Sequence, residues 1–246
     1  MPKFFVNEEQ IQKEDVKVIG NDVKHIKNVL REKVGNELII CNTSNKKDYL
    51  CKIEEISEEY IKCKIEKELE NNSESNIQVT IMQGLPKADK MELIIQKSVE
   101  LGANSIIPVN MKRCVVKLEG KDEIKKNERW QKIAESAAKQ CGRGFIPEVK
   151  HLINVKEICN WINEYDVIIV AYENEKENTL KAELKKLKAT DLKIGIVIGP
   201  EGGFEESDIK LLKESGAKIV TLGDRILRTE TVALNVLSII MYEFEQ

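Results

Sequence analysis

Histidine is scarce in this sequence of 246 residues and occurs only at His25 and His151. The two positions fall in different predicted domains, so a Ser-His-Asp or Cys-His catalytic set and a histidine metal site are both disfavoured. Six cysteines are scattered along the chain without a CxxC pair. We therefore expect reduced thiols and no bound metal.

Long apolar segments are also lacking. The longest run, Val232–Met241, is interrupted by Asn235 and Ser238 and is far too short to span a bilayer. The first residues contain no apolar signal region, so we expect a cytoplasmic protein that does not associate with membranes. With 41% hydrophobic and 33% charged residues, the composition is typical of a soluble globular protein of one large or two modest domains.

Two glycine-containing segments are the most informative features that are present. Gly199–Phe204 reads Gly-Pro-Glu-Gly-Gly-Phe, and Leu222–Thr231 reads Leu-Gly-Asp-Arg-Ile-Leu-Arg-Thr-Glu-Thr. Each follows a short apolar run typical of a strand, and neither is a Walker loop or a GxGxxG fingerprint. Glycine is favoured where the backbone takes unusual dihedral angles or approaches a ligand closely. Either segment alone is compatible with an ordinary turn, but together they predict one pocket at the carboxyl ends of two strands.

The N-terminal part of the chain has a β pattern. Short alternating segments within residues 1–70 predict a small β-barrel, with a helical stretch near residues 22–30. The expected strands there are 37–41, 49–56 and 60–65. Residues 71–76 are polar and lack apolar anchors, so they predict a linker between domains.

Residues 77–246 alternate between strands and helices, which predicts an α/β domain with a mostly parallel sheet. The expected strands are 77–82, 105–108, 167–171, 193–198 and 218–222. The expected helices are 90–101, 128–140, 155–163, 179–188, 206–215 and 230–244.

One segment is basic although the chain has a formal net charge of −3. Between Lys112 and Lys150 there are eleven Lys and Arg residues against six Asp and Glu residues. Such a segment is typical of a nucleic-acid surface. A solvated helix face with ion pairs four residues apart would have the same composition and remains the alternative.

A pocket built from backbone and apolar side chains, without metal or nucleophile, suits a reaction that depends on positioning. Methyl transfer from S-adenosylmethionine is such a reaction, because the sulfonium is already an activated leaving group. Alignment and desolvation then supply much of the acceleration.

The two glycine segments closely resemble the ribosomal RNA small subunit methyltransferase E family of the SPOUT superfamily. Shorter stretches that also resemble this family are Pro2–Val6, His25–Arg31 with Gly35, Lys87–Glu92, Lys97–Gly102, Arg113–Val116 and Gln140–Arg143. At Lys3 the family usually has Arg, and at Cys114 it more commonly has Ser. The resemblance thus extends over most of the chain.

The resemblance implies a PUA-like β-barrel, which binds RNA, followed by a SPOUT-type parallel α/β sheet with a C-terminal trefoil knot, in a homodimer. It implies an S-adenosyl-L-methionine-dependent enzyme that methylates N3 of a specific uridine in 16S rRNA of the small ribosomal subunit. Another SPOUT RNA methyltransferase, acting on tRNA or on a ribose 2'-hydroxyl, is one alternative. A non-catalytic RNA-binding factor in ribosome assembly is another.

The resemblance also implies which residues bind the cofactor. These are Gly199, Glu201, Gly202, Gly203, Leu222, Gly223, Ile226, Leu227 and Thr229. For Ile226 and Leu227, simple core packing is the alternative interpretation.

For catalysis, Arg225, Arg228 and Arg143 are candidates to stabilise a uracil anion, because a guanidinium is a permanent cation with a rigid donor fork. Glu201 or Glu230 is the candidate proton acceptor, although Glu230 fits better as an acidic residue at a helix start. Cys141 fits a structural thiol, since covalent cysteine chemistry is unnecessary at N3. The expected RNA-binding residues are Arg31, Lys87, Lys90, Arg113 and Arg143.

Overall fold

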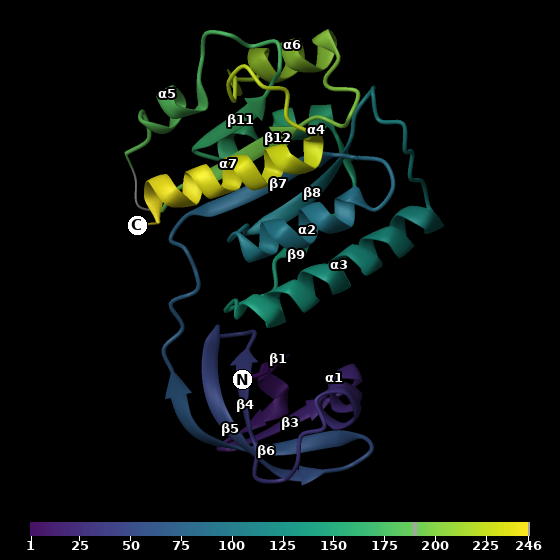
Figure 1. The fold of residues 1–246 in the computed structure, drawn as a ribbon, viewed down its shortest axis with the longest axis vertical. Coiled ribbons are helices and arrows are strands. Elements are labelled where there is room, and N and C mark those ends of the chain that lie inside the picture. Colours follow the sequence, from purple (N-terminus) through teal and green to yellow (C-terminus); the bar gives the residue numbers. More distant parts are fainter. Residues whose placement is uncertain (189–190, 246) are drawn as a thin grey trace. The chain divides into compact units, whose positions relative to one another are not determined.

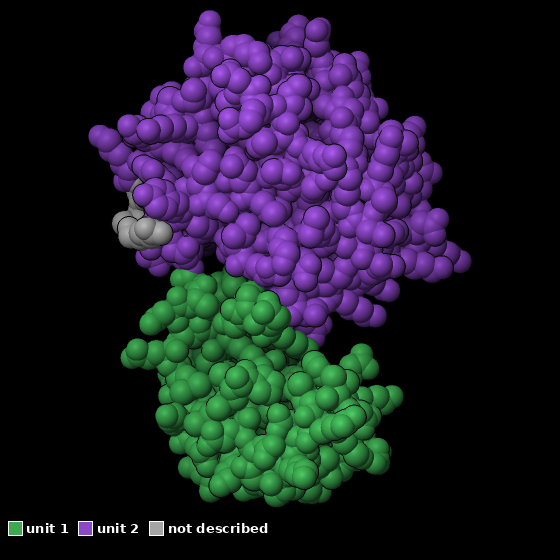
Figure 2. Space-filling view, viewed as in Figure 1, with its two compact units in different colours: residues 1–74, 138–146 green, residues 75–137, 147–246 purple. Residues whose placement is uncertain are grey.

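The computed structural model describes residues 1–188 and 191–245, which form two compact units (Figure 2). The first unit comprises Met1–Glu74 and Ala138–Ile146, and the second comprises Ser75–Ala137 and Pro147–Gln246. The predicted linker, residues 71–76, contains the first boundary between the units. The return of residues 138–146 to the first unit was not predicted, because they follow a helix of the second unit without a break in the sequence pattern. Among the residues described, no helix is both long and apolar enough to cross a bilayer.

The first unit is built on a six-stranded sheet with the order β1-β4-β5-β6-β3-β2 (Figure 1). Its strands are β1 (Lys3–Val6), β2 (Ile11–Gln12), β3 (Asp15–Ile19), β4 (Glu37–Asn42), β5 (Lys47–Ile56) and β6 (Tyr60–Leu69). Only β1 and β4 pair in parallel; the other neighbours are antiparallel. Alternating residues such as Leu38, Ile40 and Ile61 form its buried core, as the period of a half-buried strand requires.

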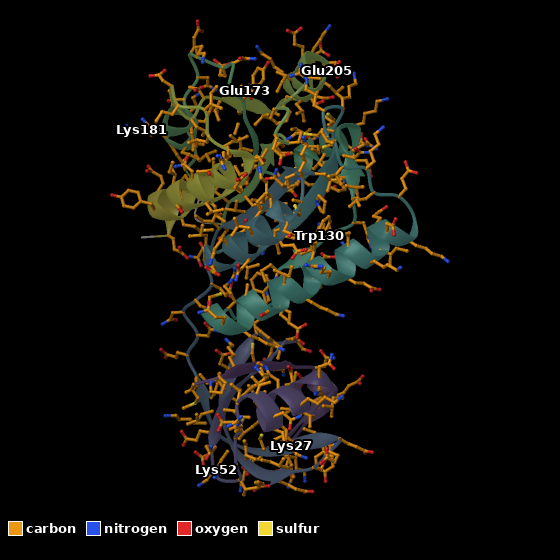
Figure 3. The ribbon with its side chains drawn as sticks, turned by 45° about the vertical axis from the view of Figure 1, so that its right-hand side comes forward. Lys27, Lys52, Trp130, Glu173, Lys181 and Glu205 are labelled. Carbon is orange, nitrogen blue, oxygen red and sulfur yellow. The ribbon has the colours of Figure 1, made fainter. Side chains whose placement is uncertain are left out.

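The sequence predicted β4, β5 and β6 but not the three shorter strands before them. Helix α1 (Asn21–Lys24) continues into a π-helical turn (His25–Val29), which confirms the predicted helical stretch. Side chains of both units are drawn in Figure 3, where Lys27 and Lys52 mark the first unit and Trp130 the second.

The second unit contains a parallel sheet with the order β10-β8-β7-β12-β11-β13, and β9 pairs with β8. Its strands are β7 (Gln78–Gly84), β8 (Ser105–Asn110), β9 (Glu148–Val149), β10 (Ile153–Asn154), β11 (Val167–Ala171), β12 (Lys193–Ile198) and β13 (Lys218–Val220). All of the pairs in this sheet are parallel. The central strands read as continuous apolar runs because helices cover both faces, and the predicted α/β class is confirmed.

The helices of the second unit are α2 (Lys90–Glu100), α3 (Lys121–Cys141, which ends in the first unit), α4 (Val155–Asn160), α5 (Leu180–Leu184), α6 (Glu206–Glu214) and α7 (Thr229–Phe244). Helix α3 begins seven residues before the predicted residue 128. The sequence analysis missed its first two turns because they are polar and lack an apolar face. Helix α5 ends well before the predicted residue 188, and residues 189–190 lie outside the described part of the chain. The other predicted helices are confirmed to within a few residues.

The chain makes a return crossing between β13 and α7. Strand β13 lies at the edge of the sheet, next to β11. Helix α7 packs on α2, β7 and β12 nearer the centre (Figure 1). Residues 221–228 therefore carry the chain back past the carboxyl ends of β11 and β12. This crossing is where the trefoil knot implied by the resemblance would lie, and it brings the two glycine segments together.

Candidate functional site

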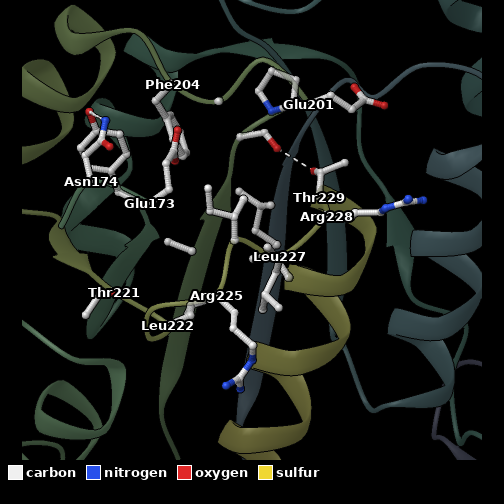
Figure 4. A pocket seen from close by; sticks show the side chains of 18 of the residues that line it. Glu173, Asn174, Glu201, Phe204, Thr221, Leu222, Arg225, Leu227, Arg228 and Thr229 are labelled. Atoms are coloured by element: carbon white, nitrogen blue, oxygen red, sulfur yellow. Dashed lines mark hydrogen bonds between the residues drawn. The ribbon is translucent and has the colours of Figure 1, made fainter. Parts of the chain in front are cut away.

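A cavity of about 630 Å3 opens at the carboxyl ends of β11, β12 and β13 (Figure 4). Its walls are residues 171–174 and 176, residues 198–204 and residues 221–229, together with Lys90 and Val232. All nine residues that the sequence analysis assigned to a cofactor line it. Small-molecule sites typically span roughly 300–1,000 Å3, so the cavity has the size of such a site.

The first turn, residues 199–204, needs its glycines. Gly203 has φ of +68°, and its N–H donates to the carbonyl of Pro200 at 2.9 Å. A Cβ atom on Gly203 would collide with the carboxylate of Glu173, and one on Gly199 would lie 3.1 Å from the ring of Phe204. The first turn thus needs glycine both for its backbone conformation and for its close packing against Glu173 and Phe204.

In the second turn, residues 222–228, glycine is needed because of the backbone conformation and not because of crowding. Gly223 has φ of +104°, and no atom lies within 4 Å of the position a Cβ would take. Its N–H donates to Thr221 Oγ1 at 3.2 Å. Ile226 is 87% exposed, so core packing is wrong as an interpretation of this residue.

A buried hydrogen-bond chain connects the two turns. The hydroxyl of Thr229, the first residue of α7, donates to the carbonyl of Gly199 at 2.6 Å, shown as a dashed line in Figure 4. Gln83, a residue of β7, donates from Nε2 to Thr229 Oγ1 at 2.8 Å. The sequence analysis did not assign any role to Gln83.

Glu201 is ion-paired at the rim of the cavity. Its carboxylate accepts hydrogen bonds from the amide of Lys87 at 3.1 Å, and Lys90 Nζ lies 3.0 Å from its Oε1. Lys90 Nζ also lies 3.3 Å from Oε2 of Glu230. Burial raises the pKa of Glu201, but hydrogen bonds from its own amide, from Lys90 and from the amide of Lys87 outweigh this effect and leave the pKa below its usual value.

Arg225 and Arg228 are exposed residues of the second turn. Within the described part of the chain, neither guanidinium has a hydrogen bond or an ion pair. Figure 4 shows the two side chains pointing in different directions from the turn. Both are therefore available to bind an anionic group at the mouth of the cavity.

One wall of the cavity was missed by the sequence analysis. It follows β11 and contains Tyr172, Glu173, Asn174 and Lys176. Tyr172 packs edge-on against Phe204 with ring centroids 6.1 Å apart. The available signal was the position of these residues at the carboxyl end of a predicted parallel strand, where ligands bind in such sheets.

The predicted RNA-binding residues are dispersed. Arg31 is exposed in the first unit, and Lys87 is exposed just before α2. Arg113 is exposed beside the first turn, where its Nη1 donates to the carbonyl of Gly202 at 3.2 Å. Among these residues only Lys90 lines the cavity.

Arg143 does not line the cavity, in contrast to the expectation that it meets the reacting base. It belongs to the first unit and is only 4% exposed. Its Nε and Nη2 bond the two carboxylate oxygens of Glu74 at 2.9 and 2.8 Å. The sequence analysis proposed Arg143 because a guanidinium can stabilise a uracil anion, whereas the chain returns to the first unit at this point.

Comparison with known proteins identifies both units. A family model described as an RNA methyltransferase domain matches residues 73–241, and one described as an RNA methyltransferase PUA domain matches residues 18–66. The ribosomal RNA small subunit methyltransferase E of Bacillus subtilis (strain 168) is 37% identical over 254 aligned residues, which cover 100% of this chain and 98% of that protein. The chain belongs to the ribosomal RNA small subunit methyltransferase E family.

Other relatives agree with this membership. The small subunit methyltransferase E of Mesomycoplasma hyopneumoniae (strain 232) is 34% identical over 97% of this chain and 98% of its own length. The structure of the Neisseria gonorrhoeae small subunit methyltransferase E, solved with bound S-adenosyl methionine, superposes with a TM-score of 0.87 at 29% identity, covering 99% of this chain and 98% of that one. These matches confirm the resemblance of the sequence motifs to this family. They also confirm the PUA-like assignment of the first unit.

Proposed function

We propose that this member of the family is an S-adenosyl-L-methionine-dependent methyltransferase that methylates N3 of a uridine in 16S rRNA of the small ribosomal subunit. The observation that carries the proposal is the single cavity enclosed by two glycine turns. The relative from Neisseria gonorrhoeae was solved with S-adenosyl methionine bound, which supports the choice of cofactor.

The cavity fits this cofactor chemically. No atom lies within 4 Å of the position that a Cβ of Gly223 would take, so a ligand can approach the backbone of the second turn closely. Leu222 and Leu227 offer apolar contact for an adenine ring, and Glu173 offers a carboxylate for hydroxyl or ammonium groups. When bound, S-adenosylmethionine supplies a methyl group on a sulfonium, which leaves as a neutral thioether.

The residues of the chain would act on the uracil. Its N3–H proton must leave before or while the methyl group arrives, so negative charge develops over N3 and the flanking carbonyls. Arg225 or Arg228, both without an ion pair inside the described chain, would hold this charge. A guanidinium suits the task because it stays protonated and donates two hydrogen bonds in a plane.

Glu201 fits a positioning role better than that of proton acceptor. Its pKa is lowered and its carboxylate is held by Lys90 and the amide of Lys87, so it is a weak base. Glu230 lies in the first turn of α7 near Lys90, which agrees with the simpler role of an acidic residue at a helix start. We assign both carboxylates to holding the turns and α2 in place.

RNA would be bound by exposed cations of both units. Arg31, Lys87 and Arg113 remain our candidates, together with exposed lysines of α3 such as Lys125 and Lys132. Contacts to phosphates position an RNA without reading its sequence, so these residues would supply affinity that falls with salt.

We further propose a cytoplasmic homodimer. Helix α7 buries Val236 and Ile240 but exposes Ile239 and Tyr242, and α2 exposes Leu93. A second subunit would cover these apolar side chains. Light scattering at micromolar concentration should give about twice the chain mass of 28.1 kDa, and a value at the chain mass would refute the dimer.

Two measurements test the function. Calorimetry should show S-adenosylmethionine binding to the purified protein. Mass spectrometry of nucleosides from 16S rRNA should show N3-methyluridine only in cells that carry the gene. Binding without any rRNA modification would favour an assembly factor, and a methyl group on tRNA or on a ribose would favour another SPOUT specificity.

A further inference from the structure

Gln83 is a polar residue at a position where the strand pattern calls for an apolar one. It lies near the end of β7, on the same face as Val79 and Ile81, and all three side chains are fully buried. Strand β7 is central in the sheet, and Gln83 pairs with Ile198, the last residue of β12. Burying a primary amide costs free energy unless its hydrogen bonds are restored, so the residue requires an explanation.

The orientation of the amide follows from its neighbours. Nε2 lies 2.9 Å from the carbonyl of Gly84, 2.8 Å from Thr229 Oγ1 and 3.4 Å from the carbonyl of Gly199. The two carbonyls can only accept, so the NH2 group must face them. The Thr229 hydroxyl then gives its proton to Gly199 and accepts one from Gln83. This arrangement leaves Gln83 Oε1 buried without a hydrogen-bond partner among the described residues.

The chain Gln83–Thr229–Gly199 joins three segments that are far apart in sequence. Gly199 opens the first turn, and Thr229 closes the second turn by starting α7. The neighbouring Gly84 adds a steric contact, since a Cβ there would lie 2.7 Å from Pro200 Cδ. The first turn thus sits directly against the end of β7, with Gln83 bonded to both turns.

We propose that Gln83 is the positioning residue that holds the two glycine turns at the separation needed to bind the cofactor. The inference rests on the proposed function, because it assumes that the cavity binds S-adenosylmethionine. Gln83 does not line the cavity, so it acts through the hydroxyl of Thr229 and the carbonyl of Gly199. A primary amide is a neutral group that supplies two donors at this point, and the unsatisfied Oε1 is the cost of that arrangement.

Replacement by an apolar residue of similar length tests the donor. In Gln83→Met, both N–H donors are lost while the shape is largely kept, so the affinity for S-adenosylmethionine should fall about tenfold. Turnover at saturating cofactor should change less than the KM for the cofactor, since no reacting group is removed. Thr80→Val is the matched control: Thr80 is a buried residue of β7 bonded to Ser105 at 3.0 Å, and it does not contact either turn. This control should keep wild-type affinity.

Gln83→Glu gives a readout that a merely structural role would not produce. A protonated carboxyl can donate to Thr229 Oγ1, whereas a carboxylate cannot and would face two carbonyl oxygens. Burial raises the pKa of a carboxyl group, so cofactor affinity in this variant should fall as the pH rises through that pKa. Gln83→Met should show no such dependence on pH.

A double-mutant cycle completes the test. If Gln83 acts through Thr229, then Gln83→Met combined with Thr229→Val should lose little more affinity than Thr229→Val alone. Wild-type affinity in Gln83→Met, an affinity of Gln83→Glu that does not change with pH, or full additivity in the cycle would each overturn the inference. Failure of the wild-type protein to bind S-adenosylmethionine would instead overturn the proposed function.

Discussion

The ammonium of Lys90 lies 3.0 Å from Oε1 of Glu201, so helix α2 and the first glycine turn are joined by an ion pair at the rim of the cavity. Both side chains are about a third exposed or less, and the amide of Lys87 adds a hydrogen bond to the same carboxylate. Lys90, which the sequence analysis expected to bind RNA, is thus ion-paired with Glu201, which it expected to accept a proton. The arrangement favours an organising role for both residues.

This relationship predicts a pH dependence of stability. The pKa of Glu201 is lowered in the folded protein, so its contribution is present above the unfolded-state pKa and is lost as the pH falls through the folded-state pKa. Glu201→Gln should lower the free energy of unfolding by about 0.5–1 kcal/mol near neutral pH, and the difference should shrink in acid. Urea unfolding across the acidic range measures it, with Glu119→Gln in an exposed loop as control. A difference that stays constant with pH would contradict this assignment.

Glu201→Gln also tests catalysis. Since the residue does not serve as proton acceptor in our assignment, the variant should keep the shape of the wild-type pH–rate profile, with a rate reduced less than about tenfold. Loss of the acidic limb of that profile, where a general base becomes protonated, would restore Glu201 as the general base.

Replacement of Gly203 in the first turn should strongly weaken cofactor binding. Gly203→Ala combines a positive φ with a collision against Glu173, so S-adenosylmethionine binding should fall at least about a hundredfold as the turn is displaced. Gly216→Ala is the control, because Gly216 has φ of +107° but only an ordinary contact at 3.8 Å with Ile162, away from the cavity. It should lose about 1 kcal/mol of stability and keep its affinity. Calorimetry and thermal unfolding of both variants separate strain from loss of the site, and equal affinities would contradict the prediction.

The sequence predicted the α/β class and the cavity because both depend on local patterns. Apolar runs such as Val167–Val170 mark buried parallel strands, and the glycines mark turns that need positive φ or a close approach. Gln83 could not be found in this way. Its role arises from contacts with Gly199 and Thr229, which are distant from it in sequence, and Thr229 reaches it only after the chain crosses back from β13.

We expect an arginine of the second turn to stabilise the negative charge that develops on the uracil. Replacement of the responsible residue, Arg225 or Arg228, by Ala should lower the single-turnover rate by about a hundredfold at saturating RNA and cofactor. Replacement of the same arginine by Lys should restore little of the lost rate, since Lys lacks the planar donor fork. Lys210→Ala, on the exposed face of α6, controls for the lost charge. Wild-type rates in both arginine variants would remove them from the mechanism.

Arg143 and Arg31 predict opposite phenotypes although both are arginines of the first unit. Arg143 is buried and paired through two nitrogens with Glu74, so Arg143→Ala leaves a carboxylate without its partner and should cost roughly 3 kcal/mol of stability. Arg31 is exposed, so Arg31→Ala should keep the stability but weaken rRNA binding and reduce its dependence on salt. Arg143→Lys should recover only part of the loss, because an ammonium cannot reproduce the two parallel bonds. Thermal unfolding and RNA binding at several salt concentrations measure both variants. A fully stable Arg143→Ala protein with slow turnover would return this residue to the catalytic site.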